Sequence, residues 1–172
     1  NASTINDGAA ALVIASEEAA ARRGLPVLAV IGWPRLAYRR RRDAKVGRVP
    51  VVVLGYHRVA DIADTPWTMT HAMFARHMEW LSRRFDLISL TQAQRLIRQG
   101  HNARPCAVVT FDDGYADNLK RALPLLLERG IPCTYFVTLA NLLDGSPFAH
   151  DLALNRSPRP NSLEEIRELA AA

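Results

Sequence analysis

The sequence is poor in cysteine and contains no long apolar run, and each shortage excludes a class of protein. Its two cysteines among 172 residues, Cys106 and Cys133, are too few for a disulfide-stapled secreted scaffold. Each begins a strand-like apolar segment, which is typical of a buried free thiol. No segment approaches the ~20 apolar residues that cross a bilayer, and the N-terminus lacks the charged-then-apolar pattern of a secretory signal. With 49% hydrophobic and 23% charged residues, the composition predicts a soluble globular chain.

The formal net charge of +5 comes from one short segment. Residues 33–50 hold seven basic residues and one acid, so the rest of the chain has a net charge of −1. The four arginines at 39–42 fit either a nucleic-acid patch or a solvated linker. Because no aromatic platform or recognition helix accompanies them, we interpret residues 33–48 as an Arg-rich linker or junction. We therefore expect no nucleic-acid partner.

From Val49 onward, apolar strand-like runs alternate with amphipathic helical segments. The run VVVLGYH at 51–57 suits a strand covered on both faces. The expected strands cover residues 51–57, 86–90, 106–111 and 132–138, and the expected helices cover 70–85, 91–100, 117–129 and a segment that opens at 160–162. This alternation predicts an α/β fold with a parallel sheet of about four strands. A closed (β/α) barrel needs eight strands and ~250 residues, so this segment is at most about half of one.

Two adjacent carboxylates follow the third expected strand, in the sequence TFDDGY at 110–115. Parallel α/β folds place their chemistry at this end of their strands. Neighbouring side chains on a strand point to opposite faces, so Asp112 and Asp113 can serve one site only if the chain turns there, and Gly114 allows such a turn. One carboxylate would then bind a metal while the other acts as a base. The alternative is an ordinary Asp-Asp-Gly surface turn.

The hexapeptide TFDDGY resembles the first motif of the polysaccharide deacetylases, the NodB-like carbohydrate esterases. The segment GYHRV at 55–59 is similar to an early motif of the branch that includes the poly-N-acetylglucosamine deacetylases. The segments FDLISL, LPLLLERGIPCTYFVT and EEIRELAAA resemble the same family, so the likeness extends over residues 49–172. The resemblance implies a partial (β/α) barrel of the NodB-like deacetylase type.

The resemblance also implies an activity, which is metal-dependent hydrolytic N-deacetylation of an N-acetylated polysaccharide of the poly-N-acetylglucosamine or chitin type. Asp112 would be the general base and Asp113 a ligand of a divalent metal, most often zinc. Gly114 and Tyr115 would contact the substrate, with the backbone N–H around Tyr115 helping to hold the oxyanion. His57, in the early motif, would protonate the departing amine.

Two departures from the family pattern affect this prediction. His150 occupies a place where relatives carry an aromatic residue before an aspartate, so we assign it no role. Family members also follow the EEIRELAAA helix with a His-x-x-x-His pair that completes the metal shell, and the sequence stops before that point. A catalytic zinc generally needs three protein ligands. We therefore expect this 172-residue chain to be inactive or to bind metal weakly, and we expect the DNA downstream to encode the missing pair.

The first 32 residues resemble a different family. The segment NASTINDGAAA is similar to the opening of the C-terminal half of thiolases, but the thiolase nucleophilic cysteine has no counterpart here. We interpret residues 1–32 as a thiolase-like fragment, which is either a genuine fusion or the product of a shifted reading frame. Two other functions remain open, an acyl-CoA acyltransferase fragment and a non-catalytic basic interaction module. Relatives of the deacetylase part act at the cell envelope or outside the cell, but the sequence does not fix the location.

Overall fold

The computed structural model describes residues 41–171. The thiolase-like segment 1–32 and the first part of the basic segment therefore lie outside the described residues. Residues 41–45 form a short helix, and the chain then enters the first strand of a sheet.

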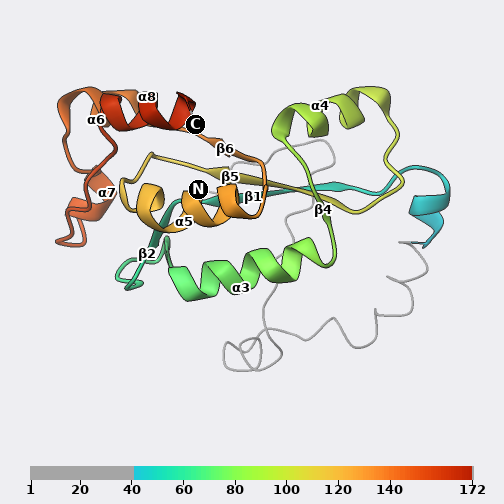
Figure 1. Ribbon diagram of the computed structural model, residues 1–172, viewed down its shortest axis with the longest axis horizontal. Helices are drawn as coiled ribbons and strands as arrows, with labels where there is room; N and C mark the ends of the chain where they lie inside the picture. The colour runs from blue at the N-terminus through green and yellow to red at the C-terminus, as the bar shows by residue number, and fades with distance from the viewer. Residues whose placement is uncertain (1–40, 172) are drawn as a thin grey trace.

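The fold is built around one buried strand, β5 (Cys106–Phe111), which is buried at all of its positions. β1 (Val51–Tyr56) runs parallel to it along its whole length, from the pair Val51↔Cys106 to the pair Tyr56↔Phe111. Two short strands share the other edge of β5. β4 (Asp86–Leu87) pairs in parallel with its beginning and β6 (Cys133–Tyr135) with its end. The predicted parallel α/β arrangement is therefore confirmed (Figure 1).

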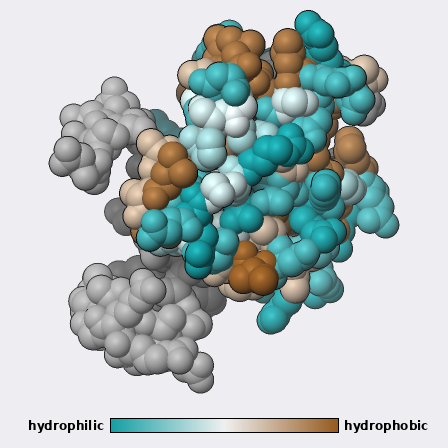
Figure 2. All heavy atoms as spheres, turned by 90° about the vertical axis from the view of Figure 1, so that its left-hand side faces the viewer, coloured by the Kyte–Doolittle hydropathy of each residue, from teal (hydrophilic) through white to brown (hydrophobic). Residues whose placement is uncertain are grey.

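The carboxyl ends of β1 and β5 point toward the side of the molecule that carries two short helices, α6 (Leu139–Asp144) and α7 (Ala149–Leu152) (Figure 1). A separate parallel pair, β2 (Arg58–Ala60) with β3 (Thr68–Thr70), lies at the same side. Each of these two strands has only three residues, so neither produces an alternation that the sequence could reveal. Figure 2 looks onto this side, which is mostly hydrophilic, with hydrophobic groups toward its margins.

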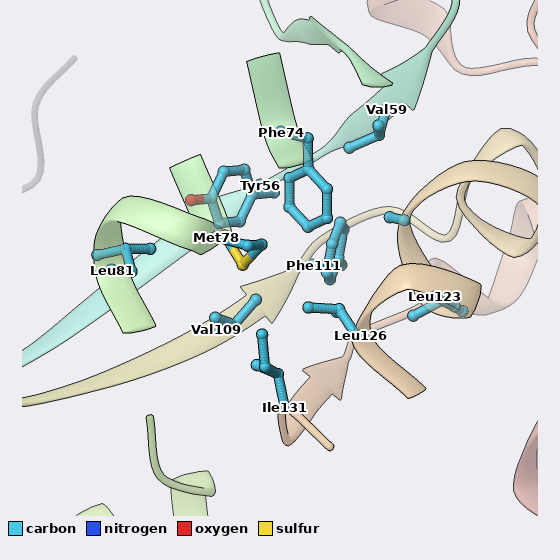
Figure 3. Packing of buried hydrophobic residues seen from close by; sticks show 11 residues of the cluster. Tyr56, Val59, Phe74, Met78, Leu81, Val109, Phe111, Leu123, Leu126 and Ile131 are labelled. Carbon is cyan, nitrogen blue, oxygen red and sulfur yellow. The ribbon is translucent and has the colours of Figure 1, made fainter. Parts of the chain in front are cut away.

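The hydrophobic core lies between the sheet and two helices, α3 (His71–Ser82) and α5 (Asp117–Glu128). Because side chains alternate along a strand, Val109 and Phe111 of β5 point into this core together with Tyr56 of β1. Phe74, Met78 and Leu81 project from α3 at helical spacing, and Leu123 and Leu126 project from α5 (Figure 3). Ala122 of α5 belongs to the same core. The helices predicted over 70–85 and 117–129 are thus confirmed within a few residues.

The predicted strand 86–90 is wrong beyond Leu87. Ser89 instead begins the helix α4 (Leu90–Gln99), because its side chain accepts from the Gln92 N–H while the Gln92 side chain accepts from the Ser89 N–H. This reciprocal capping box places the helix start ahead of Thr91, the cap expected from the sequence. The helix ends at Gly100, as predicted.

The predicted strand 132–138 is also too long. The Phe136 N–H still donates to the Phe111 carbonyl, but the Thr138 N–H donates to the carbonyl of Asp113, beyond the end of β5. The backbone after Tyr135 thus leaves the ladder to contact the Asp-Asp-Gly turn. The hydrophobic run at 132–138 alone does not show where such a contact ends the pairing of β6 with β5.

The final helix, α8 (Leu163–Ala171), begins at a capping box formed by Ser162 and Glu165. Glu165 accepts from the Ser162 N–H, and its carboxylate pairs with Arg159 at 2.6 Å. The hydrogen bond from Arg159 is the main cause that lowers the pKa of Glu165 from 4.5 to about 2.

We expect acid to loosen the start of α8 between about pH 4.5 and pH 2. A carboxylate whose pKa is lower in the folded state stabilises that state above its unfolded pKa, and the contribution is lost as the pH falls through the folded value. The protection factors of the amides of residues 162–166, that is their exchange rates relative to an unfolded peptide at the same pH, should fall across this range. Glu165→Gln should remove the pH dependence, whereas the neighbouring change Glu164→Gln should leave it in place. The same pH dependence in both variants would contradict the assignment.

Candidate active site

The Asp-Asp-Gly segment forms a tight turn at the carboxyl end of β5. The Asp112 N–H donates to the Tyr56 carbonyl at 2.8 Å and so continues the ladder with β1, and the chain then reverses. Asp113 has a φ of 70° and Gly114 a φ of 86°, and the Gly114 N–H donates to the Asp112 carbonyl at 2.9 Å. A positive φ is unusual for an aspartate and marks a conformation that the surrounding structure imposes. The turn predicted from the sequence is therefore present.

Two distant segments hold the turn in place. The Asp113 carbonyl accepts from the Thr138 N–H at 3.0 Å, and the Gly114 carbonyl accepts from the Asn161 N–H at 2.8 Å. The first donor follows β6 and the second precedes α8. The geometry of the two carboxylates thus depends on chain that lies more than twenty residues away in sequence.

Gly114 is expected to tolerate no side chain. A Cβ there would lie 2.9 Å from Cγ1 of Val137, in addition to the strain of a φ of 86°. Gly114→Ala should lower the free energy of unfolding by about 2–3 kcal/mol in urea titrations. Gly130→Ala is the matched control, because Gly130 also has a positive φ but no atom within 4 Å of an added Cβ. This control should cost about 1 kcal/mol, and equal losses in the two variants would contradict the account.

The carboxylate of Asp113 has one oxygen without a partner. Its Oδ2 is buried and accepts no hydrogen bond from any described residue. The nearest cationic candidate is Nε2 of His150, at 3.8 Å, which is too long for a hydrogen bond. Burying an unpaired carboxylate oxygen is costly unless a cation satisfies it. This oxygen therefore fits the role of a metal ligand.

Asp112 is partly exposed beside the turn and lies next to Gly55 of β1. A Cβ at Gly55 would be 3.7 Å from Oδ2 of Asp112, so glycine leaves open space beside this carboxylate. Both aspartates are partly exposed, and Asp113 differs from Asp112 in having one buried oxygen, Oδ2, without a hydrogen-bond partner. This difference fits the division into base and ligand that the sequence predicts.

Tyr115 is fully buried and belongs to a hydrogen-bond network. Its hydroxyl donates to Oδ2 of Asp151 at 2.7 Å and lies 2.7 Å from Nε2 of His150. The other oxygen of Asp151 accepts from Nε1 of Trp67 at 2.9 Å. Burial, followed by the bond to Asp151, raises the pKa of Tyr115, so the phenol keeps its proton. The Tyr115 N–H, which the sequence assigns to the oxyanion, makes no hydrogen bond to another residue among 41–171.

His57 lies at the neighbouring strand end. The pair Tyr56↔Phe111 puts the next residues, His57 and Asp112, side by side at the sheet edge. The His57 carbonyl accepts from Nδ2 of Asn118, a fully buried side chain whose Oδ1 also accepts from the Val59 N–H. No hydrogen bond or ion pair joins the His57 imidazole to either aspartate in the described structure. Its role as proton donor stays a prediction.

The arginine of the early motif has a structural role. Arg58 pairs with Asp64 and with Asp117, each at 2.6 Å, and its side chain is only 13% exposed. These two contacts join the β2–β3 segment to the start of α5. The motif GYHRV therefore combines a strand end, a candidate catalytic histidine and an arginine that fixes the following loop.

Sequence reasoning missed the residues around Tyr115. The sequence indicates no role for His150 and does not single out Asp151 or Trp67, yet all three contact Tyr115 or each other beside the Asp-Asp-Gly turn. Asp151 is completely buried. An aspartate in the largely apolar segment PFAHDLAL indicates such burial, but the partners of Asp151 lie 36 and 84 residues away along the chain.

A complete metal site is not formed within residues 41–171. No three His, Cys, Asp or Glu side chains in this range are placed to hold one metal ion. The described residues therefore fit a single ligand, Asp113. Within the same range, no helix is both long enough and apolar enough to cross a membrane.

Comparison with known proteins relates part of this chain to one family. Residues 99–169 match the sequence model of the family Polysaccharide deacetylase. The Bacillus subtilis (strain 168) protein YxkH, named for the same family, is 27% identical over 98 residues, which are 56% of this chain and 34% of that protein.

Two solved structures have a similar fold. IcaB from Ammonifex degensii superposes with a TM-score of 0.59 at 27% identity, over 70% of this chain and 48% of that one. A de-N-acetylase from Aggregatibacter actinomycetemcomitans superposes with a TM-score of 0.57 at 21% identity, over 70% of this chain and 50% of that one. The chain thus spans about half the length of these structures and about a third of YxkH.

The parallel sheet, its helices and these neighbours define the fold as a partial (β/α) barrel of the NodB-like type. The family match over residues 99–169 and these relatives support the resemblance to a NodB-like polysaccharide deacetylase domain that the TFDDGY motif indicates.

Proposed function

We propose that the protein takes part in metal-dependent hydrolytic N-deacetylation of an N-acetylated polysaccharide. The observation that carries the proposal is the Asp112–Asp113 turn, in which both carboxylates are partly exposed and Asp113 has a buried oxygen without a hydrogen-bond donor. The family match and the similarity to YxkH and IcaB support the class of reaction. The resemblance of GYHRV to the poly-N-acetylglucosamine branch favours a poly-N-acetylglucosamine or chitin-type substrate.

The proposal divides the chemistry among four groups of this chain. Asp113 would bind a divalent cation, zinc by resemblance, which when present polarises the amide carbonyl and lowers the pKa of water. Asp112 would accept the proton of the attacking water. The Tyr115 N–H would stabilise the oxyanion of the tetrahedral intermediate. His57 would donate a proton to the departing amine, which leaves a free amino group on the sugar and releases acetate.

We expect the 172-residue chain by itself to bind zinc weakly and to release no acetate. Residues 41–171 contribute one convincing ligand, and a catalytic zinc generally needs three. Competition with a chromophoric chelator should show no tight zinc site in this chain. Zinc-dependent release of acetate from a chitin-type oligosaccharide by the 172-residue chain would contradict this part of the proposal.

The reaction itself is tested with the protein in the longest form that its gene encodes, which we call the gene-encoded protein. Incubation with an N-acetylated glucosamine oligosaccharide and zinc should release acetate and expose an equal amount of sugar amine. A matched oligosaccharide without N-acetyl groups is the control and should yield neither. Failure to release acetate by a folded, zinc-loaded protein would contradict the proposed function.

A further inference from the structure

His150 is an exposed imidazole at the edge of the candidate site. Its side chain is 43% exposed, whereas Asp151, the next residue, is completely buried. Its Nε2 lies 3.8 Å from Oδ2 of Asp113 and 2.7 Å from the hydroxyl of Tyr115. The imidazole is therefore close to the reacting carboxylates, yet the proposed reaction does not use it.

The network behind His150 fixes which ring nitrogen carries the proton. Asp151 accepts two hydrogen bonds, from Nε1 of Trp67 at one oxygen and from the Tyr115 hydroxyl at the other. The hydroxyl has a single proton and gives it to Asp151, so at 2.7 Å it must accept from Nε2–H of His150. In the neutral ring, Nδ1 is then an acceptor. No hydrogen bond to Nδ1 is made by any residue of the described segment 41–171.

Packing also fixes the orientation of the ring. Phe148 stacks against it with centroids 5.7 Å apart and planes 16° apart, and Trp67 meets it edge-on at 4.8 Å and 85°. Phe148 is itself buried against Tyr115. An imidazole held on these sides loses little conformational freedom when it binds a ligand, which favours a recognition role.

We propose that His150 determines substrate specificity by accepting, at Nδ1, a hydrogen bond from a sugar hydroxyl next to the scissile N-acetyl group. This inference rests on the proposed function, because it places the sugar beside Asp112 and Asp113. Tyr115 and Asp151 are positioning residues in this scheme. They hold the imidazole in the Nε2–H tautomer and so keep Nδ1 available as an acceptor.

The tautomer is tested without any activity measurement. In the 172-residue chain labelled with ¹⁵N-histidine, at about pH 8.5 where imidazole is neutral, two-bond ¹H–¹⁵N spectra should show His150 entirely as the Nε2–H form. His150→Asn identifies the signal. Tyr115→Phe should convert His150 to a mixture of tautomers, because it removes the acceptor of the Nε2 proton. A mixture or the Nδ1–H form in the unmodified chain would overturn the inference.

The contact with sugar is tested by a pair of substitutions in the gene-encoded protein. His150→Phe keeps a ring beside Phe148 but has no acceptor, and it should raise KM for an N-acetylated glucosamine oligosaccharide about 3- to 10-fold, with a smaller effect on kcat. His150→Asn places an amide oxygen near the position of Nδ1 and should recover most of this loss. Equal KM values for the unmodified protein and the Phe variant would overturn the inference alone. Absence of acetate release by every form, including the unmodified one, would overturn the proposed function and the sugar contact together.

Discussion

Replacing Asp112 with asparagine should lower kcat for acetate release by about 10²- to 10⁴-fold, the usual contribution of a general base. Asparagine has nearly the shape of aspartate, so the backbone N–H of residue 112 can still donate to the Tyr56 carbonyl. Its side-chain amide, however, cannot accept the proton of the attacking water. Because Asp113 is the residue with the unpartnered buried oxygen, zinc content should not change. The measurement is kcat in the gene-encoded protein, together with bound zinc determined by elemental analysis.

A matched control separates the loss of this base from the loss of an aspartate elsewhere on the surface. Asp61→Asn changes an exposed aspartate that pairs with Arg121 on the surface, and its kcat should stay within twofold of the unmodified value, roughly the scale of a surface ion pair. A value of kcat for Asp112→Asn close to that of Asp61→Asn would contradict the role of Asp112. Loss of zinc from Asp112→Asn would show instead that the two aspartates share the metal.

Replacing Phe111 with alanine should lower the free energy of unfolding by about 3–5 kcal/mol, a large part of the 5–15 kcal/mol that stabilises an ordinary domain. Phe111 is fully buried, and its ring packs against Tyr56, Phe74 and Tyr135 with centroids 5.6 to 5.8 Å apart. Its removal leaves a cavity among three rings directly before Asp112. Urea titration of the 172-residue chain measures the change.

Leu127→Ala is the control for this prediction, because Leu127 lies on α5 but is 62% exposed. It should change the free energy of unfolding by no more than about 0.5 kcal/mol. Similar losses for the two variants would contradict the view that the face of the sheet covered by α3 and α5 is the core of the fold.

The parts of the fold that the sequence predicts best are those dominated by one local pattern. The strand Cys106–Phe111 is predicted at both ends, because a continuous apolar run flanked by polar residues has little alternative. Helix α3 is predicted from the spacing of Phe74, Met78 and Leu81, which all enter the core. The strand at 86–90 fails because the capping of α4 by Ser89 competes with the apolar pattern of Ile88 and Leu90.

The candidate site is predictable only in part, for a similar reason. Asp112, Asp113 and Gly114 are adjacent in sequence, so the motif alone brings them into one turn. The partners of Tyr115 come from three other segments, and no local pattern connects Trp67, His150 and Asp151. The family pattern predicts an aromatic residue at the position of His150, so it indicates no role for this histidine. The role that we propose for His150 depends on tertiary contacts with residues far away in sequence.

The measurement that tests the central claim most directly is acetate release from an N-acetylated glucosamine oligosaccharide before and after metal removal, in the gene-encoded protein and its Asp113→Asn variant. We predict that the unmodified protein loses activity on dialysis against a chelator and regains it with zinc. The Asp113→Asn variant should bind zinc at least about 10-fold more weakly and stay inactive at zinc concentrations that restore the unmodified protein. Undiminished acetate release after chelation, or by Asp113→Asn, would contradict the claim that the Asp112–Asp113 turn is a metal-dependent deacetylation site.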